Sequence, residues 1–151
     1  SIDAIHRLYH GVDAAALAGI LAESFEVVEA GVVQSDFSAE VVKRGALCLV
    51  RPDGTGAWLT PRDDVFRDVR ALDGAYLEHA LRHHDIDVSY QHGVQQVLQR
   101  LHEGAASVGV LIRPTSIVEI RRTADERLLM PPKSTFFTPK LRTGLVLRPL
   151  D

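Results

Sequence analysis

The sequence predicts an α+β domain in which helices cover one mixed β-sheet. Hydrophobic residues make up 46% of the 151 residues, which is enough for a single sizeable core. Strand-like and helix-like patterns alternate between residues 87 and 126, and this alternation favours a β-α-β-α half with a crossover between parallel strands. A turn sequence at residues 51–54 separates two apolar runs and predicts an antiparallel hairpin.

The N-terminal half contains one clear helix and one clear hairpin. Apolar residues recur at helical spacing over residues 12–23, where Asp13 can cap the first turn. A short strand is expected at residues 25–28. The continuous apolar run at residues 46–50 predicts a buried strand, and residues 57–59 return as the second arm of the hairpin.

Two further helix starts are expected before the β-α-β-α half. Residues 60–63 combine a capping hydroxyl, a proline at the first helical position and an acid in the first turn. A second helix is expected to begin at Asp73, with Tyr76, Leu77, Ala80 and Leu81 on one face. Residues 1–11 show no determined fold, and no internal repeat is visible in the sequence.

The β-α-β-α half has the strongest periodicity. Residues 87–90 predict a strand, and residues 94–101 carry apolar side chains at i, i+3, i+4 and i+7. Residues 108–112 predict a central buried strand, against which that helix packs. A capping-box pattern at residues 116–119 then starts a last helix.

Charge and composition exclude several functional classes. The formal net charge of −3 argues against a nucleic-acid-binding surface, which is usually strongly basic. No apolar stretch approaches the roughly 18 residues of a membrane span, so we expect a cytoplasmic protein. Cys48 is the only cysteine, which excludes an intrachain disulfide, and its apolar neighbours predict a buried, inert thiol.

Residues 127–150 are basic, in contrast to the rest of the chain. They contain five Lys and Arg residues and no acid. Lys133, Ser134 and Thr135 follow two prolines, and this combination of an ammonium with two hydroxyls suits a phosphate or carboxylate. The alternative is a solvated basic loop that two phenylalanines, Phe136 and Phe137, anchor to the core.

Three other basic residues are expected to take part in the same site. Lys140 and Arg142 follow Pro139, and a chain folded back at the intervening aromatic residues and proline would bring Arg142 next to Lys133. Arg113 lies where a strand passes into a helix N-terminus, which favours anions. Ser116 in that segment is more simply explained as the cap of its own helix.

The segment at residues 129–146 resembles the C-terminal signature of the family called domain of unknown function 1015. The shared pattern is a Met-Pro-Pro-Lys-Ser-Thr run followed by aromatic residues, Pro-Lys and a Gly-Leu-Val strand. Weaker similarity reaches upstream to residues 103–115 and to residues 5–7. The resemblance implies that residues 1–151 form one domain, the C-terminal region of a longer protein. The longer members carry an upstream histidine motif that this chain lacks, and its own His83-His84 pair does not match that motif.

Two functions follow from these patterns. In the first, the chain binds a small phosphorylated or carboxylated metabolite and forms the binding half of a larger enzyme, whose upstream domain supplies the chemistry. In the second, it is a structural or interaction module that packs against that upstream domain or a second copy of itself. The sequence patterns do not indicate which residue is catalytic or which cofactor is bound. We assign no metal site, although His79 and His83 are four residues apart on one helix face.

Overall fold

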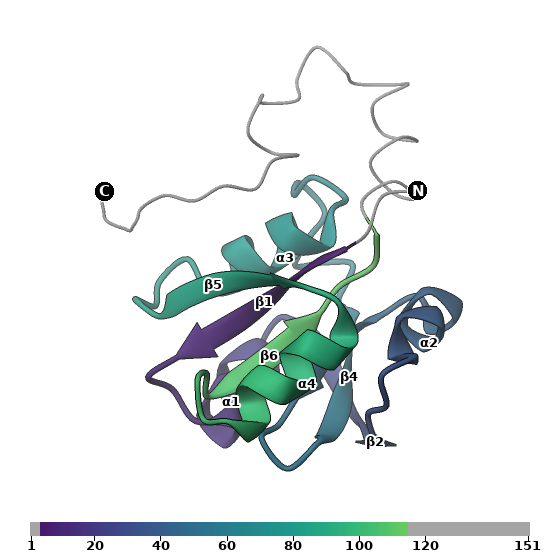
Figure 1. The fold of residues 1–151 in the computed structure, drawn as a ribbon. Coiled ribbons are helices and arrows are strands. Elements are labelled where there is room, and N and C mark those ends of the chain that lie inside the picture. Colours follow the sequence, from purple (N-terminus) through teal and green to yellow (C-terminus); the bar gives the residue numbers. More distant parts are fainter. Residues whose placement is uncertain (1–3, 115–151) are drawn as a thin grey trace. The chain divides into compact units, whose positions relative to one another are not determined.

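The computed structural model describes residues 4–114, all of which lie in the first of two units of the chain, Ser1–Ile120. The second unit is Arg121–Asp151. The prediction of one domain over residues 1–151 therefore stays a prediction. The described elements, in chain order, are β1 (Ile5–His10), α1 (Ala14–Leu21), β2 (Phe25–Val32), α2 (Phe37–Arg44), β3 (Leu47–Val50), β4 (Thr55–Pro61), α3 (Asp73–Ala80), β5 (Asp87–His92), α4 (Val94–His102) and β6 (Val108–Leu111) (Figure 1).

The predicted α+β class is confirmed. The described strands form one sheet in the order β2-β4-β3-β6-β1-β5, and each neighbouring pair among them is antiparallel. The expected crossover from β5 through α4 to β6 is present, and these two strands run in the same direction. They are not direct neighbours, however, because β1 lies between them and pairs with both. The helix expected after residue 116 lies outside the described residues.

The four described helices cover both faces of the sheet. Leu17 and Leu21 of α1 and Leu77 of α3 belong to one hydrophobic cluster, whereas Val41 of α2 and Val97 of α4 belong to the other. Figure 1 shows α4 lying across β6. The sheet is therefore the middle layer of three, with α1 and α3 on one side and α2 and α4 on the other.

The centre of the sheet is fully buried, as the sequence predicts. Every residue of β3 and β6 is buried. Val110 is 0% exposed, and the predicted helix face packs against this region with Val94, Val97 and Leu101 buried and Leu98 partly buried. The central position of residues 108–112 and the packing of α4 are both confirmed.

The helix start expected near Pro61 is wrong, and the N-terminal segment whose fold the sequence left undetermined is a strand. Residues 60–63 do not start a helix, because Pro61 is the last residue of β4, opposite Phe25, and the amide of Arg62 donates to the carbonyl of Ser24 at 3.0 Å. The amides of Val65 and Phe66 donate to the carbonyl of Arg62, so a single turn follows β4, and it does not continue as a helix. Residues 5–10, which showed no determined fold, form β1. Tertiary pairing with β5 and β6 on both sides decides that strand.

The topology contains an internal duplication that the sequence patterns did not show. The elements β1-α1-β2-α2-β3 are followed by β4-α3-β5-α4-β6, which repeat the same sequence of strands and helices. Inward from one edge of the sheet the strands are β2, β4 and β3, and inward from the other edge they are the equivalent strands β5, β1 and β6. The first strand of each half lies inside the other half: β4 between β2 and β3, and β1 between β5 and β6. Weak sequence signs agree, since Asp13 and Asp73 stand at the starts of α1 and α3, and Arg-Pro follows soon after β3 and β6.

Candidate functional site

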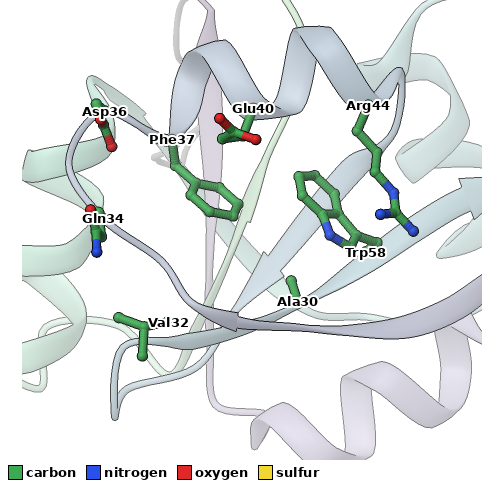
Figure 2. Close-up of a pocket in the computed structure, with 8 residues that line it drawn as sticks. All are labelled: Ala30, Val32, Gln34, Asp36, Phe37, Glu40, Arg44 and Trp58. Carbon is green, nitrogen blue, oxygen red and sulfur yellow. The ribbon is translucent and has the colours of Figure 1, made fainter.

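A pocket of about 400 Å³ opens between β2, β4 and α2 (Figure 2). Its volume falls within the range of roughly 300–1,000 Å³ that small-molecule sites occupy. Aromatic side chains form its inner wall, and polar and charged side chains form its rim. The lining residues are Ala30, Val32, Gln34, Asp36, Phe37, Glu40, Arg44 and Trp58.

The inner wall is a stack of three side chains. The rings of Phe37 and Trp58 are nearly parallel, with centroids 5.3 Å apart, and the guanidinium of Arg44 lies 5.1 Å from the Trp58 ring centroid. Figure 2 shows Trp58 between Phe37 and Arg44. Phe37 and Arg44 are the first and last residues of α2, so one helix supplies both ends of the stack. Stacking on an aromatic face restricts the guanidinium and attracts it electrostatically.

Two hydrogen-bond donors of this stack have no partner among residues 4–114. Trp58 is only 7% exposed, yet no residue among 4–114 accepts a hydrogen bond from its indole N–H. In Figure 2 the indole nitrogen lies on the side of the ring toward Ala30. A buried N–H without an acceptor costs about 1–3 kcal/mol. The guanidinium of Arg44 likewise forms no ion pair with any carboxylate of the described residues.

The rim adds carboxylates next to the donors of the inner wall. Asp36 precedes α2, and Glu40 lies in its first turn, so two negative charges stand at the mouth of the pocket. Gln34 adds an amide that both donates and accepts. The site therefore offers an apolar wall, donors for an oxygen atom and acceptors for an amine, all within one pocket.

The structure places one of the predicted anion-binding residues. Arg113 follows β6 and binds the buried carboxylate of Asp73: its backbone N donates to Oδ2 at 2.8 Å, its Nε to Oδ2 at 3.0 Å and its Nη2 to Oδ1 at 2.6 Å. The hydrogen bonds to the Asp73 carboxylate raise the pKa of the Arg113 guanidinium above its usual value. Arg113 is thus held by an internal carboxylate, and its role toward an external anion stays a prediction. The other predicted ligands, Lys133, Ser134, Thr135, Lys140 and Arg142, lie outside the described residues.

Of the two histidines expected on one helix face, only His79 lies on a helix, because α3 ends at Ala80 and His83 lies in the turn that follows. The ring of His79 meets Phe66 edge-on, with centroids 5.7 Å apart. Residues 4–114 contain no cluster of three or more His, Cys, Asp or Glu side chains that could hold a metal ion. His79 therefore contributes to the aromatic contacts beneath α3.

Cys48 is buried in β3, as predicted, and is 0% exposed. Burial raises the pKa of its thiol to about 12. Because only the thiolate is reactive, we expect a thiol reagent such as dithionitrobenzoate to label the native chain at pH 8 at least about 100-fold more slowly than the chain unfolded in guanidinium. Equal labelling rates in the two states would contradict this expectation.

Sequence reasoning missed the pocket. The signals available were weak: Trp58 is the only tryptophan of the chain, and Arg44 lies two helical turns after Phe37. The sequence of residues 36–45 does not by itself distinguish a helix from other structure, so the spacing of Phe37 and Arg44 has no clear meaning without the fold. The meeting of α2 with Trp58 depends on the pairing of β4 with both β2 and β3.

Comparison of the chain with known protein families, curated proteins and solved structures found no relative. The chain matches no protein-family model, and no curated protein and no solved structure is significantly similar to it. Among the described residues, no helix has the length and apolar character that crossing a membrane requires.

Proposed function

We propose that this chain is a ligand-binding domain and that the pocket beside Trp58 is its binding site. The observation that carries the proposal is the buried indole N–H, which has no acceptor within the described part of the chain, next to a guanidinium that has no carboxylate partner there. Both donors belong to side chains that aromatic stacking already holds in place. A bound oxygen atom offsets the cost of burying the indole N–H.

The charges around the pocket favour a small carboxylated metabolite that also carries an amine. A carboxylate accepts hydrogen bonds from Trp58 and Arg44, and the amine is attracted by Asp36 and Glu40. A phosphorylated metabolite, which carries up to two negative charges, meets stronger repulsion from the two acids. An amino acid has the required arrangement of charges.

The wider context of the chain is also part of this proposal. The resemblance of residues 129–146 to the family called domain of unknown function 1015 supports a place at the C-terminal end of a larger cytoplasmic protein. In that arrangement the upstream domain supplies any chemistry, because no catalytic set is identified among residues 4–114. The anion-binding role expected for the basic residues from Lys133 to Arg142 is a separate proposal, and the pocket beside Trp58 does not depend on it.

The fluorescence of Trp58 provides a direct test. Because Trp58 is the only tryptophan, a ligand in the pocket changes the emission of the whole chain. We expect titration with free amino acids to change that emission saturably for at least one of them. The variant Arg44→Gln should weaken the affinity about tenfold to a hundredfold, which corresponds to the loss of about 1.5–3 kcal/mol from one hydrogen bond to a charged group.

The matched control is Arg100→Gln, which removes the same charge from the last turn of α4, the counterpart of α2. It should leave the affinity unchanged. Monocarboxylates that lack the amine should bind more weakly than the amino acids of the same side chain. Equal affinities of the wild-type chain and Arg44→Gln for every bound amino acid, or no change in emission with any amino acid, would refute the proposed site.

An interaction module is the second candidate function, and the edges of the sheet favour it. Val28 and Val32 on edge strand β2 are 44% and 67% exposed, and Val88 and Tyr90 on edge strand β5 are 40% and 47% exposed. Exposed edge strands offer unpaired backbone groups to a second chain. A concentration-dependent mass in light scattering that Val88→Lys abolishes would favour this function, whereas a monomer up to about 1 mM would exclude self-association through β5.

A further inference from the structure

A second cavity, of about 210 Å³, lies between α3, β1 and β5 on the opposite face of the sheet from Trp58. Leu77, Leu81, Ile86 and Val88 form its apolar walls. Its other lining residues are Arg7, Tyr9, Glu78, His84 and Tyr90. No residue is shared with the pocket beside Trp58, so this second cavity is an independent feature.

Tyr9 carries a buried hydroxyl that has no hydrogen-bond partner in the described range, residues 4–114. The residue is 4% exposed, and no residue among 4–114 forms a hydrogen bond with its hydroxyl group. Burial holds the pKa of this hydroxyl well above its usual value, and smaller electrostatic effects come from Arg7, Tyr90 and Glu78. These three residues all line the cavity. A tyrosine hydroxyl that is buried usually finds a hydrogen-bond partner.

Arg7 lines the same cavity as Tyr9 and is held there by two contacts. Its Nη1 donates to the carbonyl of Ile5 at 2.5 Å, and its guanidinium lies 4.9 Å from the centroid of the Tyr90 ring. Among the described residues Arg7 has no carboxylate within ion-pair distance. Its remaining N–H groups are therefore available to an anion.

The internal duplication shows that the fold does not require these polar residues. The strands β3 and β6 have the same length and are equivalent in the duplication. Ala57 pairs with β3 where Arg7 pairs with β6, and Leu59 pairs with β3 where Tyr9 pairs with β6. Ala57 and Leu59 are both completely buried. At this equivalent place α1 replaces α3, and Ala18 follows the buried Leu17 where Glu78 follows Leu77. Between α1, β2 and β4 these positions thus carry apolar side chains, whereas between α3, β1 and β5 an arginine, a tyrosine and a glutamate line a cavity.

We infer that the cavity between α3, β1 and β5 binds a small carboxylic acid with an apolar body. Its carboxylate accepts hydrogen bonds from the Tyr9 hydroxyl and the Arg7 guanidinium, and its body packs against Leu77, Leu81 and Val88. A neutral hydroxyl together with one guanidinium matches a single negative charge. Glu78 at the rim disfavours a ligand with two negative charges.

The test uses benzoate as the probe and benzamide as its uncharged counterpart. We expect benzoate to shift the amide NMR signals of β1, α3 and β5 in the ¹⁵N-labelled chain, and benzamide to bind at least about tenfold more weakly. Tyr9→Phe preserves the ring and the packing but removes the hydroxyl. It should weaken benzoate binding about tenfold or more, as expected for one hydrogen bond to a charged group.

Two further variants separate this site from the one proposed above. Arg44→Gln, in the pocket beside Trp58, should leave benzoate binding to β1, α3 and β5 unchanged, so either site can fail without the other. Glu78→Gln should strengthen benzoate binding because it removes a negative charge from the rim. The inference is overturned by equal benzoate affinities of the wild-type chain and Tyr9→Phe, by signal shifts confined to other elements, or by tighter binding of benzylamine than of benzoate.

Discussion

Replacing Asp73 with alanine is expected to destabilise the fold by about 3–5 kcal/mol, the usual cost of removing one partner from a buried ion pair. The Asp73 side chain is only 2% exposed and accepts three hydrogen bonds from Arg113. Without the carboxylate, the partly buried guanidinium and the backbone N–H of Arg113 lose their acceptors. Urea denaturation of Asp73→Ala and the wild-type chain, followed by circular dichroism, measures the difference.

The exposed ion pair between Glu29 and Arg51 provides the matched control. The Glu29 side chain is 69% exposed, so Glu29→Ala should cost no more than about 1 kcal/mol. The double variant Asp73→Ala with Arg113→Met should recover part of the loss, because it removes the uncompensated charge as well. A cost of Asp73→Ala no larger than that of Glu29→Ala would show that the Arg113 pair does not stabilise the end of β6.

Acidification from pH 8 to pH 4 is expected to remove about 3 kcal/mol of stability through His6 alone. His6 is 2% exposed, and its Nδ1 accepts a hydrogen bond from the Ile112 amide at 3.1 Å, so the neutral ring is the form that the fold holds. Burial, followed by the nearby Arg7 and His92, lowers its pKa from 6.5 to about 4. The unfolded chain therefore binds the proton at higher pH than the folded chain, and protonation favours unfolding as the pH falls from 6.5 toward 4.

Denaturant unfolding at several pH values, in the wild-type chain and in His6→Gln, tests this dependence. His6→Gln has no ionisable side chain at this position, so its stability should fall less steeply between pH 6.5 and pH 4. The difference between the two slopes isolates His6 from the other groups that titrate in the same range. His102→Gln, on the exposed end of α4, should behave like the wild-type chain. Parallel stability curves for His6→Gln and the wild type would contradict the assignment.

Local patterns in the sequence determined the α+β class and several elements of the fold. The helical spacing of residues 94–101 and the unbroken apolar run at residues 108–112 predicted α4 and β6 together with their burial, because a buried element must carry apolar side chains on each face that it buries. Turn residues 51–54 similarly predicted the hairpin of β3 and β4. These features depend on neighbours in the sequence, which a local pattern can reveal.

The tertiary structure alone decided which strands pair, and with them both cavities. Residues 5–10 form a strand because β5 and β6 supply their hydrogen bonds from more than 75 residues away, and the same pairing brings Tyr9 and Arg7 under α3. Trp58 meets Phe37 and Arg44 only because β4 lies between β2 and β3. Each half of the fold places its first strand between strands of the other half, so these contacts join residues that are far apart in the sequence. Such residues show no common periodicity, because periodicity reflects only neighbours along the chain.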